Sequence, residues 1–374
     1  MISREQLQSL IDRRANGSRI LSAYLDMSVN SENKRTYDIF LTKRKADFRE
    51  LASDRPGHHR EAIGAAFDRL ERWLAEQFDQ GNKGAAAFIE LGGGWSETME
   101  LPLPVENRLV VGDRPIVAPL VEIVERYHHH GVVLVDREHL RLLSLYLDQT
   151  LHEREVTTEP YPAPHDVKRG GFSAKDFQKR KEEEARHFFK EFAAEVETFD
   201  RNHRPDDLIL LGTTENVKKF SDILPEHIRR KIAHTARAEL DSSPSEIREK
   251  LAPVFQERLQ REEAEAVDLL RERIRESHKA VAGFDRTLEQ LQEGKVDTLI
   301  IARDADASGG RCDKCGFLLT RASGTCPYCG GDLSDGVDLV EEMVRMAGEQ
   351  DARIDFVAGS TLHDLGGVGG LLRF

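Results

Sequence analysis

Apolar residues occur along this chain in two kinds of pattern. Short, mainly apolar runs at residues 20–25, 132–135, 208–211 and 296–302 are typical of buried strands. Between such runs, apolar residues recur every three or four positions, as at residues 61–78, which predicts helices with one buried face. Because the two patterns alternate along the chain, they predict an α/β fold.

Changes in these patterns divide the chain into three predicted α/β domains, at residues 1–112, 113–278 and 279–374. The third domain contains a small cysteine-bearing insert at residues 309–335. Within the second domain, the segment 159–169 is rich in proline and polar residues, which predicts an exposed loop.

Two long helices are predicted in the second domain. One begins at Ala174, runs for about 25 residues and has basic first turns. The other is highly charged and is predicted over residues 252–277.

Composition narrows the class of protein mainly by exclusion. The 374 residues include 54 Lys and Arg against 67 Asp and Glu, which gives a formal net charge of −13, and 39% are hydrophobic. This balance excludes a disordered or collagenous chain. No apolar run approaches the ~20 residues that span a bilayer, and the first residues lack a secretion signal. We expect a cytoplasmic protein without a membrane partner and, since no heptad seam is present, a monomer.

All four cysteines lie within 18 residues, in two Cys-x-x-Cys pairs. Four thiolates at this spacing satisfy tetrahedral Zn²⁺ and leave no open position for catalysis. Disulfides are disfavoured in a reducing compartment, and a redox site needs only one pair. We therefore predict a structural Zn²⁺ held by Cys312, Cys315, Cys326 and Cys329. Gly316 and Gly330 follow the two pairs and provide the backbone freedom that each turn needs.

Histidines are clustered at residues 128–130. Consecutive side chains point in different directions, so these three are poorly placed to share a metal ion. We interpret them as capping a helix that ends at Tyr127, where positive charge suits the helix dipole.

The most unusual local composition lies between His165 and Lys181. This segment has six Lys or Arg and two Asp, although the whole chain is acidic. Two glycines let the backbone approach a partner closely, and the flanking cations suit phosphate groups. An RNA-facing loop is one interpretation, and an exposed loop whose charges are only solvated is the other. The candidate contact residues are Lys168, Arg169, Gly170, Gly171, Phe172, Ser173, Lys175, Lys179 and Arg180.

Residues 115–374 resemble the archaeo-eukaryotic class-1 peptide-chain release factors and the related Pelota rescue proteins. In release factors the corresponding loop reads Gly-Arg-Gly-Gly-Gln-Ser-Ala and leads into a helix. The residues that match it in register are Arg169, Gly170, Gly171, Ser173, Ala174 and Phe177. The cysteine pairs fall where archaeal members carry a zinc ribbon, and residues 367–374 resemble the glycine-rich end of the family's third domain. The resemblance is to a bacterial-type member.

Two departures from the family pattern affect function. Phe172 occupies the position of the glutamine that, in the family, orients water for peptidyl-tRNA hydrolysis, and a phenyl ring cannot do this. Residues 1–110 also lack Asn-Ile-Lys-Ser and contain no cysteine, so the family's stop-codon motifs are absent. The family's architecture is therefore expected without its release chemistry.

The resemblance then implies a ribosome-associated factor for rescue or dormancy, whose Gly-Gly loop enters the A site toward the peptidyl-transferase centre. The loop cations would neutralise ribosomal RNA phosphates, while Phe172 would stack on a base or on a tRNA end. The implied partners are the ribosome, its RNA, tRNA and a translational GTPase docked on the third domain.

Two alternatives stay open, and no catalytic residue is assigned. The first is a release factor that hydrolyses peptidyl-tRNA with a non-glutamine loop, using the backbone N–H of Phe172. The second is a non-ribosomal RNA-binding or scaffold protein on the same fold.

Overall fold

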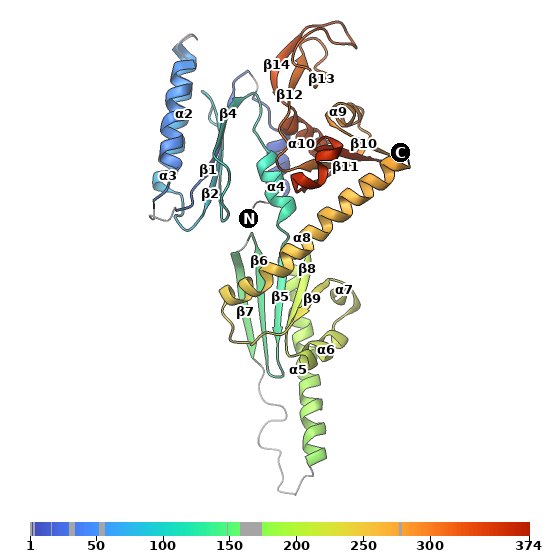
Figure 1. Ribbon diagram of the computed structural model, residues 1–374. Coiled ribbons are helices and arrows are strands. Elements are labelled where there is room, and N and C mark those ends of the chain that lie inside the picture. The colour runs from blue at the N-terminus through green and yellow to red at the C-terminus, as the bar shows by residue number, and fades with distance from the viewer. Residues whose placement is uncertain are drawn as a thin grey trace. The chain divides into compact units, whose positions relative to one another are not determined.

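The computed structural model describes residues 2, 4–15, 17–29, 34–51, 57–147, 149–157, 174–276 and 279–374. These residues form two compact units (Figure 1). One unit combines residues 1–126 with 257–374, and the other contains residues 127–256. Both units combine sheets with helices, so the predicted α/β class is confirmed.

An antiparallel sheet of order β3-β2-β1-β4 forms the N-terminal part of the first unit. Its strands are β1 (Ile20–Asp26), β2 (Gly84–Glu90), β3 (Ser96–Leu101) and β4 (Arg108–Gly112). Nearly all of β1 and β2 is buried, because alternate side chains enter two different cores. Leu21 and Leu25 pack with residues of α2 (Tyr37–Leu51) and α3 (Gly57–Glu76). Ile20 and Tyr24 instead join the core that contains α1 (Arg4–Asp12).

A second sheet, of order β10-β16-β11-β15, forms the C-terminal part of the same unit. Its strands are β10 (Ala280–Ala282), β11 (Val296–Ala302), β15 (Arg353–Val357) and β16 (Val368–Leu372), with β11 and β15 parallel. Leu299 and Ile301 pack with α9 (Phe284–Gln292) and α10 (Leu339–Glu349). Ile300 and Ala302 pack with the C-terminal half of α8 (Pro244–Arg275) and with α11 (Gly359–Leu362), which is followed by the 3-10 helix His363–Leu365.

A buried carboxylate joins the two parts of this unit. Glu341 in α10 accepts hydrogen bonds from the backbone N–H groups of Val117 (2.8 Å) and Ala118 (3.0 Å), at the start of α4 (Ala118–Arg126). Arg345, one turn further along α10, contacts the same carboxylate at 3.3 Å, and both side chains are almost fully buried. Burial raises the pKa of Glu341, while Arg345 and the two backbone donors lower it. Glu341 is thus both the N-terminal cap of α4 and the partner of a buried arginine.

The second unit contains a five-stranded sheet of order β7-β6-β5-β8-β9. Its strands are β5 (His130–Val135), β6 (His139–Tyr146), β7 (Gln149–Thr157), β8 (Asp207–Gly212) and β9 (Ile232–Ala236). Strands β5, β8 and β9 are parallel to one another, and the β5–β6–β7 meander is antiparallel. Helices α5 (Ala174–His203), α6 (Thr214–Ile223) and α7 (Glu226–Arg229) supply core residues on one face. The first turns of α8 cover the other face through Ile247 and Leu251.

The predicted charged helix begins earlier than its sequence pattern indicates. The structure starts α8 at Pro244 rather than at residue 252. Ser243 and Glu246 form a reciprocal capping box, in which each backbone N–H donates to the other side chain. Pro253, which is typical of a helix start, lies inside the helix.

The junction at Glu341 yields a prediction about stability. Glu341→Ala leaves the two buried backbone N–H groups at the start of α4 without an acceptor and leaves Arg345 with Glu342 as its remaining acidic partner, so we expect it to lower the free energy of unfolding by about 2–4 kcal/mol. Both tryptophans, Trp73 and Trp95, lie in the first unit, so tryptophan fluorescence during urea denaturation measures that unit. In the control, Glu349→Ala removes the partner of Arg114. Because Glu349 is more exposed than Glu341, this variant should lower the free energy of unfolding by less than about 1 kcal/mol. Equal effects of the two variants would contradict this assignment.

Candidate functional site

The four cysteines lie together on a small three-stranded sheet of order β13-β12-β14. Its strands are β12 (Ser308–Cys312), β13 (Leu318–Leu319) and β14 (Leu333–Asp338). Each Cys-x-x-Cys pair is followed by a turn in which a glycine N–H donates to the first cysteine's carbonyl, at 2.8 Å for Gly316 and 2.9 Å for Gly330. Both glycines have φ near +70°, a conformation that favours glycine, as the sequence predicted. Two similar knuckles therefore face one another.

The sulfur positions fit one tetrahedral metal ion. All four Sγ atoms lie within 4.8 Å of one another. Cys312 and Cys329 are separated by 3.4 Å between sulfurs, and Cys315 and Cys326 by 3.7 Å. Four sulfurs about 2.3 Å from a central Zn²⁺ would be about 3.8 Å apart, whereas a disulfide bond is only about 2.05 Å long. The sulfur–sulfur distances are compatible with a metal site and are too long for disulfide bonds.

Neighbouring groups shift the pKa values of Cys312 and Cys315 in opposite directions. A hydrogen bond from the backbone N–H of Cys315 lowers the pKa of the Cys312 thiol to about 6. The backbone N–H of Phe317 lowers the pKa of Cys315, but the neighbouring sulfurs, led by that of Cys329, and burial together raise it to about 12. Four thiolates at this distance repel one another unless a cation lies between them.

The backbone beside the cage leaves no room for a side chain. A Cβ atom at Gly331 would lie 2.7 Å from the Cβ of Lys314 and 3.1 Å from the Sγ of Cys312. The rings of Phe317 and Tyr328 pack against each other on the same ribbon, with centroids 4.2 Å apart. The cysteine cage is therefore closely enclosed on the side of Gly331.

Most of the predicted RNA-binding loop lies outside the described residues. This applies to Lys168, Arg169, Gly170, Gly171, Phe172 and Ser173. Lys175, Lys179 and Arg180 belong to α5, where the backbone is described and these side chains are not. The predicted loop contacts therefore stay predictions.

Helix α5 is long and packs against the sheet over only part of its length. It has 30 residues, and its recorded buried apolar side chains begin at Phe188 and include Phe192 and Phe199. The preceding turns from Ala174 correspond to about 21 Å of helix and extend past the sheet (Figure 1). The loop predicted before Ala174 is therefore attached to the outer end of a stalk.

His129 and His130 contact partners outside helix α4 and do not cap it as the sequence suggested. Helix α4 ends at Arg126, and His130 opens strand β5, where its Nδ1 lies 2.6 Å from Asp207 Oδ1. The His130 ring also stacks on Phe255 at 4.1 Å. His129 Nε2 lies 2.6 Å from Ser144 Oγ. Strand pairing brings these distant partners together, and the local sequence gives no sign of them.

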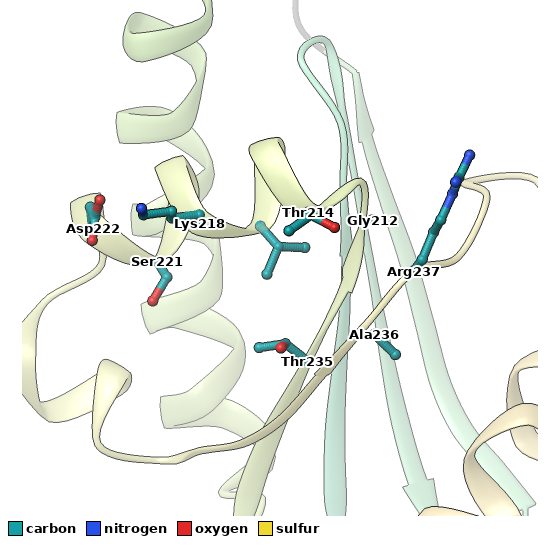
Figure 2. A pocket seen from close by; sticks show the side chains of 9 residues that line it. Gly212, Thr214, Lys218, Ser221, Asp222, Thr235, Ala236 and Arg237 are labelled. Carbon is teal, nitrogen blue, oxygen red and sulfur yellow. The ribbon is translucent and has the colours of Figure 1, made fainter.

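The second unit also contains a cavity of about 350 Å³ that the sequence did not predict. It lies between α6 and the end of β9, where Gly212, Thr214, Ser221 and Thr235 contribute to the lining (Figure 2). Gly212 ends β8, and a Cβ there would lie 2.4 Å from the carbonyl oxygen of Val135. The sequence feature that could have indicated this cavity is its basic composition, because residues 212–237 contain six Lys or Arg and three Asp or Glu.

Comparison with known proteins assigns the fold to a family. Residues 115–256 match the model of "Bacterial archaeo-eukaryotic release factor family 10", and residues 260–374 match "eRF1 domain 3". The chain belongs to the archaeo-eukaryotic release factor superfamily. The superfamily expected from the loop, the cysteine pairs and the C-terminal residues is thereby confirmed.

Curated relatives in this superfamily are peptide chain release factors. Peptide chain release factor subunit 1 of Methanococcoides burtonii is 24% identical over 293 residues, which are 69% of each chain. The corresponding protein of Thermococcus onnurineus is 22% identical over 306 residues, 73% of each chain. Among solved structures, Archaeoglobus fulgidus Pelota is 17% identical with a TM-score of 0.32, and the match covers 78% of this chain and 79% of that one.

Among the described residues, no helix is both long enough and apolar enough to cross a bilayer.

The cysteine cage predicts the metal content of the purified chain. We expect about one metal ion per chain by elemental mass spectrometry, and its loss in the Cys312→Ser, Cys329→Ser double variant. Because metal binding stabilises so small a ribbon, the variant should be cleaved more rapidly by protease between Leu319 and Leu333. Tyr328→Phe changes the ribbon without removing a ligand and should retain both the metal and the protease resistance. Wild-type protein purified without metal and still resistant would contradict a structural site.

Proposed function

We propose that this protein is a cytoplasmic, ribosome-associated translation factor that serves rescue or dormancy. Membership of the release-factor superfamily across residues 115–374 is the observation that carries the proposal. The Gly-Gly loop of this chain binds in the ribosomal A site and is directed toward the peptidyl-transferase centre.

Two features of the second unit support this mode of binding. The segment 165–181 has six Lys or Arg against two Asp, which suits contact with RNA phosphates in a chain whose net charge is −13. Helix α5 carries that segment at its outer end, about 21 Å before its first recorded buried phenylalanine. A loop on such a stalk can enter a narrow site while the sheet stays outside it.

Phe172 determines what the loop does once bound. Its side chain offers no group that orients water, so we assign it to stacking on a nucleic-acid base, worth about 1–3 kcal/mol. The loop then occupies the centre without hydrolysing the ester bond.

The remaining sites have supporting roles. Cys312, Cys315, Cys326 and Cys329 hold one Zn²⁺, since four thiolates in a tetrahedral cage suit this ion and leave no coordination position open. The bound ion would fix the ribbon and supply no chemistry. The C-terminal domain provides the docking platform for a translational GTPase, by analogy with the superfamily.

A hydrolytic function is the second candidate, because the curated relatives named above are peptide chain release factors. In this alternative the backbone N–H of Phe172 stabilises the developing oxyanion without help from a glutamine.

Co-sedimentation with purified bacterial ribosomes at near-physiological salt tests the proposed binding. The triple variant Lys168→Glu, Arg169→Glu, Lys179→Glu should lose about tenfold or more in ribosome affinity, since each cation is expected to neutralise a phosphate. A control with the same change in charge is Arg44→Glu, Arg69→Glu, Arg72→Glu on α2 and α3, and it should pellet like wild type. Wild-type protein that never pellets with vacant or tRNA-loaded ribosomes would favour the scaffold alternative.

Release of a labelled peptide from ribosome-bound peptidyl-tRNA separates the two candidates. We expect no release above background with wild type, and a gain of about 100-fold with Phe172→Gln if the rest of the loop positions water correctly. Phe177→Gln, in the following helix, is the control and should stay at background. Release by the wild-type chain would establish the hydrolytic alternative.

A further inference from the structure

We infer that the cavity between α6 and β9 is a second RNA-backbone contact, which binds a single RNA strand across its opening. The inference rests on the proposed ribosome association and adds to it a surface separate from the Gly-Gly loop. Its nine lining residues come from the end of β8, from α6, and from β9 together with the residue that follows it.

Charge is the first argument for a polyanion. Lys218 and Arg237 line the cavity on opposite sides (Figure 2). Within the described part of the chain, neither side chain has a recorded ion pair or hydrogen bond. Lys219, the neighbour of Lys218 on the same helix, is instead neutralised by Glu215 at 2.8 Å. Two available cations separated by a concave floor suit successive phosphates better than one compact anion.

The floor of the cavity favours a sugar-phosphate backbone over a base. Thr214, Ser221 and Thr235 place hydroxyl groups around it, and Val217 and Ala236 supply apolar surface. Hydroxyl groups can hydrogen-bond to a ribose 2′-OH, which DNA lacks. No aromatic side chain is among the nine lining residues, so base stacking is absent and the contact should be independent of sequence.

The lining of the cavity is too exposed to surround a free nucleotide. Lys218, Thr235 and Arg237 are exposed residues, and Asp222 at the rim would repel a compact multiply charged phosphate. A strand that crosses the cavity places its phosphates on the two cations and can avoid Asp222.

Fluorescence anisotropy with a labelled 12-nucleotide oligouridine tests this assignment in the full-length chain. Lys218→Glu, Arg237→Glu should weaken RNA binding about tenfold or more and reduce the slope of log K against log salt by about 1.4, the value for two single-strand phosphate contacts. Lys219→Glu, Arg230→Glu makes the same change in charge at two cations that already have acidic partners, and it should bind within about twofold of wild type. Because charge reversal can disturb folding, Lys218→Gln, Arg237→Gln is measured beside it and should show the same ranking with a smaller loss.

Substrate comparisons test the remaining parts of the inference. Oligodeoxyuridine should bind more weakly than oligouridine, and Ser221→Ala, Thr235→Val should reduce that difference. Equal RNA affinity of the Lys218/Arg237 and Lys219/Arg230 variants, or no RNA binding by wild type, would overturn the inference. Displacement of the RNA by micromolar inorganic phosphate or ATP would identify a small-molecule site instead. Normal oligouridine binding combined with loss of ribosome pelleting in the Lys218/Arg237 variant would indicate a protein contact and also overturn it.

The loop variant separates failure of this inference from failure of the proposed function. If the Lys168/Arg169/Lys179 variant loses ribosomes and the Lys218/Arg237 variant keeps normal RNA and ribosome binding, only the cavity assignment fails. If wild type never pellets with ribosomes yet binds oligouridine through Lys218 and Arg237, the RNA contact stands and the proposed ribosomal function fails.

Discussion

The first unit depends on one carboxylate in a place where water cannot solvate it. Glu341 can lie there because both of its oxygens accept hydrogen bonds from backbone N–H groups and one of them also contacts a buried arginine. Those N–H groups belong to the segment that follows β4, and its Ile116 is bonded through N–H to Ser22 and through its carbonyl to Tyr24. One connecting segment is thus fixed between strand β1 and helix α10. The N-terminal sheet and the C-terminal sheet therefore share a core, although about 170 residues separate them in sequence.

The cysteine ribbon also depends on local hydrogen bonds from backbone N–H groups. Its two knuckles fix the sulfurs by short-range backbone hydrogen bonds, and in the proposed function a metal ion takes the place of the apolar core that so small a sheet cannot build. Such a site stabilises a protruding element at little cost in sequence length. In the proposed function this suits a docking surface, because the shape of the ribbon would then depend on coordination and not on a partner.

The second unit combines a rigid sheet with peripheral cations. In the proposed function the basic loop at the end of α5 makes the deep contact, and the cavity beside α6 adds a shallow one to the RNA backbone. In that function a net charge of −13 would oppose indiscriminate binding to RNA, so that binding depends on the places where Lys and Arg gather.

The sequence by itself determined what depends on short-range spacing. The α/β class, the cysteine knuckles with their glycines and the family motifs are all readable within a few residues, and the structure and comparisons confirm the class and the superfamily. Tertiary structure alone decided that Glu341 is buried more deeply than Glu342, since the two differ only in what packs around them. It also gave His130 its partner Asp207, 77 positions away, and placed Lys218 opposite Arg237. Such pairings follow from strand order and helix packing, which no local pattern of residues specifies.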